Sequence, residues 1–491
     1  MLKLIKKKEL TKLDSAHIEC LPQSELIILC KNSVHTNKHL YDRLNQNSST
    51  SNLPPSSDIF SGKKCSGEST STGKQHNKAD VRKQRANGVG RTQVLKTHRT
   101  EAIKPLVCCT CQQPFTASAL KCYTGFYQID LEKLAEDTFY HVLQTKFTLF
   151  DGHCPHCQTI TRATIARLPT DMDDKTLSRQ GIVGPTLAAE IITFHKENIT
   201  SIRKIKATLQ RLFGIKLSEG TIIQTINNGG IALEPVVETY RLEATKAPYA
   251  HMDETTWRNV GKKLWLWVIV THNLCIFMMG RRTKAMAEAF LSTGFIGWLM
   301  TDGYQAYRDY KKRFRCWSHL ERKGKACAES TDTEVSGFGT TLLALLNHLK
   351  AGIYHARESG NTASIMADYE DTLTEIKKLC ESNKDSVHKK VKSLARELLN
   401  DWEAIFRILD YPHYPLTNNE AERALRQWVL LRKVTQGSQS ESGCRATCAI
   451  ASVIGTAKKR ANEFVATLKT HLHEGLGVMN HITYRPLRLS G

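Results

Sequence analysis

The sequence contains no run of about 20 apolar residues, the length that a helix needs to cross a bilayer. Its most apolar segment, LWLWVIVTHNLCIFMMG, is broken by Thr271, His272 and Asn273 and is typical of a β-hairpin. The start, MLKLIKKKEL, is basic but lacks a following apolar core and a small-residue cleavage site. We therefore expect neither a membrane span nor a secretory signal, and we expect a cytoplasmic location.

Acidic residues are scarce relative to basic ones, with 48 Asp and Glu against 69 Lys and Arg and a net charge of +21. This imbalance predicts an anionic partner, and without a membrane-spanning segment it favours nucleic acid. The 15 cysteines are an odd number in a chain without a secretory signal, which argues against a disulfide framework. We expect thiolates that bind metal, or thiols buried as small hydrophobes.

The length of 491 residues is too great for one compact core and predicts about three or four domains. Residues 1–60 hold short apolar patches, such as SELIILC, and predict a weakly helical region. Residues 61–100 carry ten Lys or Arg against two acids. Because that composition cannot bury enough apolar surface to fold, we expect a basic flexible linker that is either simply solvated or lies along phosphates.

Residues 175–240 place apolar side chains at helical spacing in three bursts. Gly214 is a typical helix stop, and Ser218 can cap a further helix that begins near Gly220. A helix, a short turn with glycine and a second helix form the helix-turn-helix outline. DNA binding by this unit and a plain helical spacer both remain open.

The periodicity changes after residue 245. The runs YAHMDETTW, KLWLWVIVT, LCIFMMGRR and FIGWLMTDG predict four strands, with a helix in KAMAEAFLS before the fourth. This order opens an α/β fold. Residues 335–411 contain no convincing strand and predict a large all-helical insertion. We therefore expect one domain built from 245–334 and 412–475, followed by a C-terminal tail over 476–491.

Three acids fall at informative places in this domain. Asp253 lies in the first strand, and Asp302 follows the fourth strand directly. After the insertion, Thr417 to Glu420 match a capping box, in which each of the two side chains bonds to the other residue's backbone N–H. Glu420 therefore has a structural role, whereas Glu422 borders the apolar face of the same helix and could lean over a sheet edge.

Each of these acids also has a structural alternative. Asp253 and Asp302 can be turn formers or solvated strand ends, and Glu422 can pair with Arg426. Together they suggest a carboxylate cluster, whose repulsion hard cations such as Mg²⁺ or Mn²⁺ would offset. Two cations also suit phosphodiester cleavage, because its barrier reduction, on the order of 20 kcal/mol, far exceeds the roughly 3 to 5 kcal/mol that a general base supplies.

Two Cys-x-x-Cys pairs are a strong signal for one structural Zn²⁺ bound by four thiolates, and predict a zinc-ribbon-like module over residues 101–165. These are Cys108 with Cys111 and Cys154 with Cys157. The gap between the pairs is longer than the usual spacing of about 15 to 20 residues. Unliganded buried thiols and redox chemistry remain open. The competing ligands are Cys109, His153 and His156.

Several segments resemble, in order and context, the catalytic region of bacterial transposases of the insertion sequence 66 family: HMDETTWRNVGKKLWLWVIVT, TDGYQAY, CWSHLER and TNNEAERALRQWVLLRKV. NSSTSNLPPSSD and the cysteine pairs extend the resemblance. It implies a ribonuclease-H-like (retroviral-integrase-like) fold with an Asp-Asp-Glu triad, here Asp253, Asp302 and Glu422, and two Mg²⁺ or Mn²⁺ ions. Cys316 and His319 resemble a Cys-x-x-His feature of such enzymes, although a buried thiol and a satisfied histidine remain the alternative.

The resemblance further implies cleavage at the ends of a mobile element, followed by attack of the freed 3′ hydroxyls on target DNA. The implied partners are double-stranded DNA, other copies of the chain on that DNA and accessory proteins of the same element, at the bacterial nucleoid. The zinc module would help to recognise the element's ends. Candidate phosphate contacts, for which solvated positions remain open, are Arg423, Arg426, Arg432 and Lys433.

We therefore expect a multidomain DNA transposase that depends on divalent metal. One alternative is a non-catalytic DNA-binding protein with a zinc module, a helix-turn-helix and acids that are merely structural. The other is a nuclease of the same fold that cleaves DNA without joining it.

Overall fold

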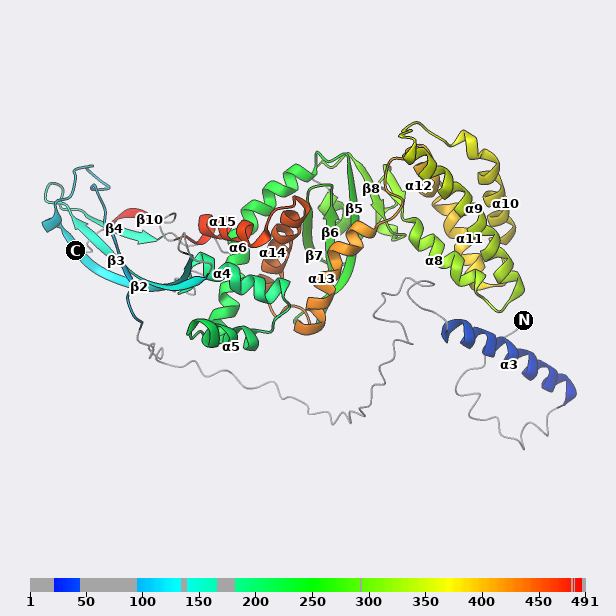
Figure 1. Cartoon of the computed structure of the whole chain (residues 1–491), viewed down its shortest axis with the longest axis horizontal. Helices are drawn as coiled ribbons and strands as arrows, with labels where there is room; N and C mark the ends of the chain where they lie inside the picture. The colour runs from blue at the N-terminus through cyan, green and yellow to red at the C-terminus, as the bar shows by residue number, and fades with distance from the viewer. Residues whose placement is uncertain are drawn as a thin grey trace. The chain divides into compact units, whose positions relative to one another are not determined.

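A computed structural model describes residues 22–44, 95–133, 139–165, 182–291, 294–477, 480 and 482–487. Most of the predicted basic linker lies outside these residues. The chain divides into two compact units (Figure 1). The larger unit comprises Asp80–Trp298 and Asn419–Gly491, and the smaller unit comprises Met1–Ala79 and Leu299–Asn418.

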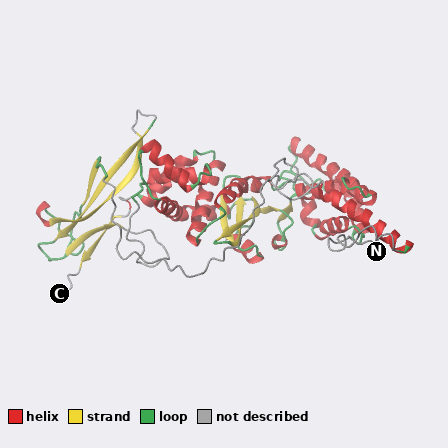
Figure 2. Cartoon of the chain, turned by 90° about the horizontal axis from the view of Figure 1, so that it is seen from below, coloured by secondary structure: helices red, strands yellow, loops and turns green. Residues whose placement is uncertain are grey.

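The larger unit begins with a five-stranded sheet (Figure 2). Its centre is β3 (Tyr140–His153), which pairs antiparallel with β2 (Leu120–Lys133) in a long hairpin and parallel with β1 (Arg99–Ile103). The end of β3 pairs with β4 (Ile160–Ile165), and β4 pairs with β10 (Ile482–Leu487). The strand β10 lies in the segment predicted as a tail, so the end of the chain completes the sheet.

The sheet is tied to the first helix by the middle of β2. Gly184 begins the helix α4 (Pro185–Ile192) without a capping side chain. The carboxylate of Asp130 on β2 takes that role, because its Oδ1 accepts the backbone N–H of Leu187 at 2.8 Å. Burial raises the pKa of Asp130, even though the backbone N–H groups of Leu187 and Leu131 favour its ionised form.

The helices after α4 follow the predicted helix-turn-helix outline. A short π-helix (Thr193–Glu197) precedes α5 (Ile202–Phe213), which ends at Gly214 with φ +65°, and the Ser218 Oγ accepts the Thr221 N–H at 3.0 Å to begin α6 (Glu219–Ala244). Gly214 and Ser218 therefore act as predicted, since glycine adopts a left-handed conformation without strain and serine satisfies an N–H at a helix start.

Three antiparallel strands form the core of the larger unit, as predicted: β5 (Tyr249–Asn259), β6 (Lys262–Val270) and β7 (Cys275–Gly280). We call them the meander. The helix α7 (Lys284–Leu291) follows β7, and α13 (Asn419–Thr435), α14 (Glu441–Lys459) and α15 (Phe464–Leu476) return after the smaller unit. The predicted apolar face of α13 is buried on the meander through Ala421, Leu425 and Trp428, with Ala424 partly buried beside them.

The edge strand β7 is closed by side chains of α14. The N–H of Cys275 bonds to the Thr456 Oγ1 at 3.1 Å, and the N–H of Phe277 bonds to the Ser452 Oγ at 2.9 Å. Ser452 and Thr456 lie about one helical turn apart along α14. This separation is close to the distance between Cys275 and Phe277, whose N–H groups both point out of the open edge of the strand. The helix thus satisfies edge groups that would otherwise be open to pairing with another chain.

The smaller unit contains α3 (Gln23–Leu44), β8 (Trp298–Thr301) and β9 (Arg313–Arg315), the last two being paired in parallel. The helix α8 (Trp317–Ala328) leads into the predicted insertion, which contains helices and no strand. Its α-helices are α9 (Thr333–Glu358), α10 (Glu370–Asn383), α11 (Lys389–Asn400) and α12 (Trp402–Phe406). Among the described helices of the chain, none is long and apolar enough to cross a membrane.

Buried ion pairs fix the insertion to β9. The Arg315 side chain is fully buried and contacts Glu397 at 2.5 Å and Asp401 at 3.0 Å, while Arg313 contacts Asp401 at 2.6 Å. Removing one member would leave a buried charge without its partner, which is strongly destabilising. The strand that follows the Asp302 turn is therefore held by the helices of the insertion.

We predict that Thr456→Val destabilises the larger unit by about 1–3 kcal/mol, because valine keeps the shape but leaves the buried Cys275 N–H unpaired. Thr470→Val is the control, since the Thr470 hydroxyl bonds only within α15 at an exposed position. Thermal unfolding followed by tryptophan fluorescence measures the difference. Equal effects of the two substitutions would show that edge closure by α14 contributes nothing.

Candidate functional site

Two segments of the first sheet, residues 107–114 and 153–160, share one local structure. Each is closed by a bridge between its ends, Val107 with Pro114 and His153 with Ile160. Each contains the pattern Cys-x-x-Cys-Gln at the same offset. The repeated glutamine was visible in the sequence and was missed there.

The glutamine has the same function in both turns. Gln112 and Gln158 adopt φ of +60° and +58°, and their N–H groups bond to the carbonyls of the first cysteines, Cys108 and Cys154, at 2.9 and 3.0 Å. The left-handed residue turns the chain back so that both thiols of a pair point to one side. We call these turns the two knuckles.

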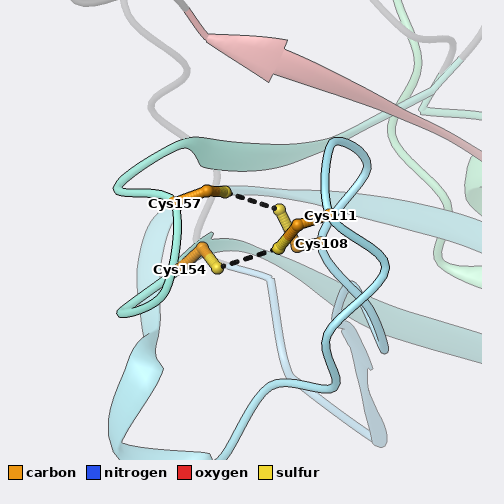
Figure 3. A group of neighbouring side chains, drawn as sticks. All are labelled: Cys108, Cys111, Cys154 and Cys157. Carbon is orange, nitrogen blue, oxygen red and sulfur yellow. Dashed lines mark hydrogen bonds between the residues drawn. The ribbon is translucent and has the colours of Figure 1, made fainter.

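The knuckles bring their four sulfurs together (Figure 3). The Sγ atoms of Cys108 and Cys157 lie 3.5 Å apart, as do those of Cys111 and Cys154, and all four lie within 4.8 Å of one another. A tetrahedral Zn²⁺ with Zn–S bonds of about 2.3 Å separates its sulfurs by about 3.8 Å. The donor set and its spacing therefore fit one zinc ion.

The pKa values of the thiols also indicate that a cation is needed at this site. Burial opposes ionisation of Cys108, but the backbone N–H groups of Cys111 and Thr110 lower its pKa to about 6. The backbone N–H of Gln113 favours the Cys111 thiolate, but burial and the neighbouring sulfurs raise the pKa of Cys111 to about 12. Four thiolates can thus coexist only if a positive ion offsets their mutual repulsion.

None of the three competing ligands belongs to the cluster of four sulfurs. Cys109 contacts the hydroxyl of Thr161, whose Oγ1 lies 3.4 Å from its sulfur and 3.1 Å from its backbone N. His156 is exposed at the tip of its knuckle, and His153 is only half-buried. The long gap between the pairs is explained by the β2–β3 hairpin, which occupies most of it.

Asp253 faces the helices that cover the meander. It lies opposite Val268 in the β5–β6 register, and paired residues of antiparallel strands project to the same side. Val268 belongs to the core that α13 covers, so Asp253 is on that side too. The half-buried carboxylate accepts the backbone N–H of Glu254 at 2.8 Å.

Glu420 and Glu422 are placed by the first turn of α13. This helix begins at Asn419, one residue later than a cap at Thr417 requires, so the predicted capping box is not the reason for Glu420. Its carboxylate instead pairs with Lys459 on α14 at 2.6 Å, which lowers the pKa of Glu420, with His251 of β5 adding to the effect. The first turn thus lies near the start of β5.

Glu422 follows the fully buried Ala421 and is half-buried. It therefore lies at the margin of the packed face of α13, on the side of the meander that carries Asp253. The identities of these residues were predicted from the sequence, and their shared side follows from the strand register.

Asp302 belongs to the smaller unit and follows β8 directly. Its Oδ1 accepts the N–H of Tyr304 at 2.8 Å, so the residue does form a turn, which was its structural alternative. The other carboxylate oxygen has no hydrogen-bond partner among the described residues. Because a carboxylate offers about four acceptor sites, the turn leaves Asp302 able to bind a cation.

Cys316 and His319 stand at the start of α8. The Cys316 thiol is buried and accepts the Asn418 N–H, with 3.2 Å between the atoms, and its sulfur lies within 4.8 Å of a His319 ring nitrogen. Burial, reinforced by nearby cations of which Arg322 is the strongest, lowers the pKa of His319 to about 3. The imidazole is therefore neutral at physiological pH.

The four predicted phosphate contacts divide into two groups. Arg423, Arg426 and Lys433 are exposed. Their successive spacings of three and seven residues place them along one side of α13. Arg432 is half-buried, and its guanidinium bonds to Thr255 and to Thr256 on β5. Arg432 therefore ties α13 to the meander.

We predict that Glu420→Gln lowers the unfolding free energy at pH 7 by a few tenths to about 1 kcal/mol, because the partner Lys459 is only partly screened. The folded-state pKa of Glu420 is lowered, so the stabilisation is present above the unfolded value of about 4.3 and is lost as the pH falls through the folded value. The variant and the wild-type protein should therefore converge in acid, once Glu420 is protonated in the folded state.

Chemical unfolding at several pH values checks this, with Arg423→Gln as the control. Arg423 is 70% exposed and lies 3.4 Å from Glu420, so its loss should matter less. A deficit of Glu420→Gln that stays the same at every pH at which the chain is folded would contradict the ion-pair account.

A family model and a curated protein are similar to parts of the chain. A family model described as Transposase IS66 family matches residues 180–446, which is more than half of the chain. The chain is also similar to uncharacterized protein y4qI of Sinorhizobium fredii (strain NBRC 101917 / NGR234), with 25% identity over 288 residues, or 50% of this chain and 51% of that protein. The chain thus spans about half the length of the curated relative it matches.

The family match includes the helix-turn-helix outline, the meander, the helical insertion and α13, whereas both knuckles precede it. It contains Asp253, Asp302 and Glu422. The chain belongs to the Transposase IS66 family.

Proposed function

We propose that the chain is a DDE-type DNA transposase that cleaves DNA at the ends of a mobile element and joins those ends to target DNA. The proposal rests on one observation: Asp253 lies on the side of the meander that α13, the helix with Glu422, covers. We also propose a ribonuclease-H-like fold for residues 245–334 and 412–475. The order of elements fits it: three antiparallel strands, a helix and a further strand come first, and α13 follows the insertion.

Asp253, Asp302 and Glu422 would hold the divalent cations. Carboxylate oxygens are the donors that Mg²⁺ and Mn²⁺ prefer, and all three side chains are half-buried rather than fully solvated. When bound, a pair of such ions activates an attacking hydroxyl and stabilises the leaving oxygen of a phosphodiester. The chain's own contribution is to hold three acids on rigid elements, two on strands or at their ends and one on a packed helix.

The environment of the acids suits a polyanion. Arg423, Arg426 and Lys433 form an exposed cationic row on the helix that carries Glu422. Contacts from such side chains to phosphates position a DNA strand without reading its sequence. We propose that this row holds the strand whose phosphate enters the acidic site, while Arg432 keeps the helix seated on β5.

We also propose that the two knuckles bind one structural Zn²⁺. The ion would fix the ends of β1, β3 and β4 to one another, since each knuckle connects two of the strands of that sheet. Four thiolates close the coordination shell, so the role is structural and not catalytic. The module would then present its sheet as part of the surface that meets the element's ends.

One assay separates the transposase from its two rivals. The purified chain is incubated with Mg²⁺ and DNA that carries the ends of its element, and the products are resolved on denaturing gels. Joined products support the transposase, and cleavage without joining supports a nuclease of the same fold. A salt-sensitive shift without cleavage supports a non-catalytic DNA-binding protein.

We predict that Asp302→Asn and Glu422→Gln each reduce cleavage by at least about a thousandfold while DNA affinity stays the same or rises, because a negative charge is removed near phosphates. Glu420→Gln is the matched control, two residues from Glu422 on the same helix, and should retain most of the cleavage. Loss of cleavage in Glu420→Gln with full activity in Glu422→Gln would reverse the assignment.

We predict that Cys111→Ser removes the bound zinc and unfolds the first sheet, since a structural zinc site contributes roughly 10–16 kcal/mol to the folding of a small module at pH 7. Cys109→Ser, in the same knuckle, should keep one zinc per chain because its thiol faces Thr161. Metal analysis of the purified chains gives the answer. Equal zinc content in the two variants would show that the four thiols of the knuckles do not form the zinc site.

A further inference from the structure

The helix α5 exposes a row of cations that no part of the mechanism uses. Its buried side carries Ile205 and Leu209, which pack inward. The remaining surface of α5 is mostly exposed and carries cations near its start and again in its last turn, and the loop after it adds one further lysine. The exposed cations are Arg203, Lys204, Lys206, Arg211 and Lys216.

These cations have almost no acidic partners. Arg203 lies 3.8 Å from Glu219, and both side chains are largely exposed, so that pair is weak. Among the described residues, none of the other four cations pairs with an acid. A row of unneutralised positive charge on one side of a helix is an electrostatic fit for a line of phosphates.

The start of α6 is exposed beside this row. Ile223 is 47% exposed, and Gly220 and Gln224 are exposed on the same two turns. Glutamine can bond to adenine in the major groove, and an apolar side chain can contact the thymine methyl group. The middle turns of α6, residues 225–234, contain no exposed residue, so on this side of the unit the N-terminal end of α6 is the part that can enter a groove.

Gly220 is required neither by packing nor by the backbone. A Cβ placed there would find its nearest atom, the Ser218 Oγ, at 3.8 Å, so packing within the protein tolerates a larger residue. Its φ is not in the left-handed region, so the conformation does not call for glycine either. Alanine favours a helix more than glycine does, and close approach of a partner from outside the chain would explain glycine at the second position of α6.

We propose that α5 and the first two turns of α6 form a docking surface for duplex DNA, in which the α5 cations contact phosphates and Gly220 lets α6 approach a base edge in the major groove. This surface rests on the proposed function for its biological role, since it would select the DNA on which the acids act. An anionic membrane would also attract the cations, but it gives no reason for a glycine at a helix start or for an exposed glutamine beside it.

The phosphate contacts are tested with Lys206→Gln/Arg211→Gln in the full chain. The control is Lys377→Gln/Lys378→Gln, which removes two exposed cations from α10. Binding to a fluorescent duplex of about 30 base pairs and mixed sequence is measured without Mg²⁺ across a salt series. The α5 variant should reduce the slope of log K against log salt by about 1.8, or about 0.9 for each phosphate that is no longer neutralised. A slope equal to that of the control overturns the proposal.

The close approach is tested with Gly220→Ala. This variant should unfold at the same temperature as the wild-type chain or higher, because alanine favours the helix. It should nevertheless bind DNA selected by the wild-type chain from a random duplex library about tenfold more weakly, the size expected when one base is no longer recognised. Unchanged affinity for the selected DNA overturns the role of α6, since a misfolded variant is excluded by its own melting curve.

Two further outcomes decide the partner. Binding to vesicles with anionic lipid that is lost in the α5 variant, without any effect on duplex binding, replaces DNA by a membrane surface and refutes the proposal. If the α5 and α6 variants bind DNA like their controls while Asp302→Asn abolishes cleavage, the docking surface fails and the proposed chemistry stands. Weakened binding in these variants together with full cleavage by Asp302→Asn supports the surface and refutes the triad.

Discussion

The packing of α13 and α14 on one side of the meander is the constraint on which the rest of the structure depends. Trp428 meets Phe277 with ring centroids 5.6 Å apart, and the hydroxyls of Ser452 and Thr456 bond to the backbone of β7. A helix held by both a buried face and specific hydrogen bonds cannot slide along the strands without losing both. The helix α13 is held in the same way, by its buried face and by the bonds of Arg432 to Thr255 and Thr256, so its first turn, and with it Glu422, is fixed on the side that carries Asp253.

The larger unit combines side chains with three kinds of chemistry. The knuckles bring four thiols together, Asp253 and Glu422 lie on one side of the meander, and α5 and α13 display cations. These donor types select different ions, since thiolates prefer Zn²⁺ and carboxylates prefer Mg²⁺. The proposed acidic site is compatible with a strongly basic chain, because cations around it would attract the polyanion that the acids alone would repel.

Local patterns in the sequence predicted what depends on neighbouring residues. Gly214 and Ser218 mark the helix-turn-helix boundaries, the interruption at Thr271 marks the hairpin, and Ala421 and Leu425 mark the packed side of α13, all as the structure has them. Partners distant in the chain were missed. The capping box assigned to Glu420 is local in the sequence, but Lys459 on another helix offers a charged hydrogen bond, and the helix begins one residue later than that box requires.

Two further features could not be predicted because they depend on space rather than on neighbours in the chain. Ile482, Thr483 and Tyr484 favour a strand, but so short a segment is not identified as one until β4 provides its partner. Gly220 looked like an ordinary helix start, and only the empty space around it reveals that packing does not require glycine.

The most direct measurement of the central claim is anomalous diffraction from crystals of the full chain soaked in Mn²⁺. The account predicts two peaks about 3.5–4 Å apart, each within bonding distance of carboxylate oxygens from Asp253, Asp302 and Glu422. Peaks that leave out any one of the three acids, or no peak near them in well-ordered crystals that bind Mn²⁺ elsewhere, would contradict it.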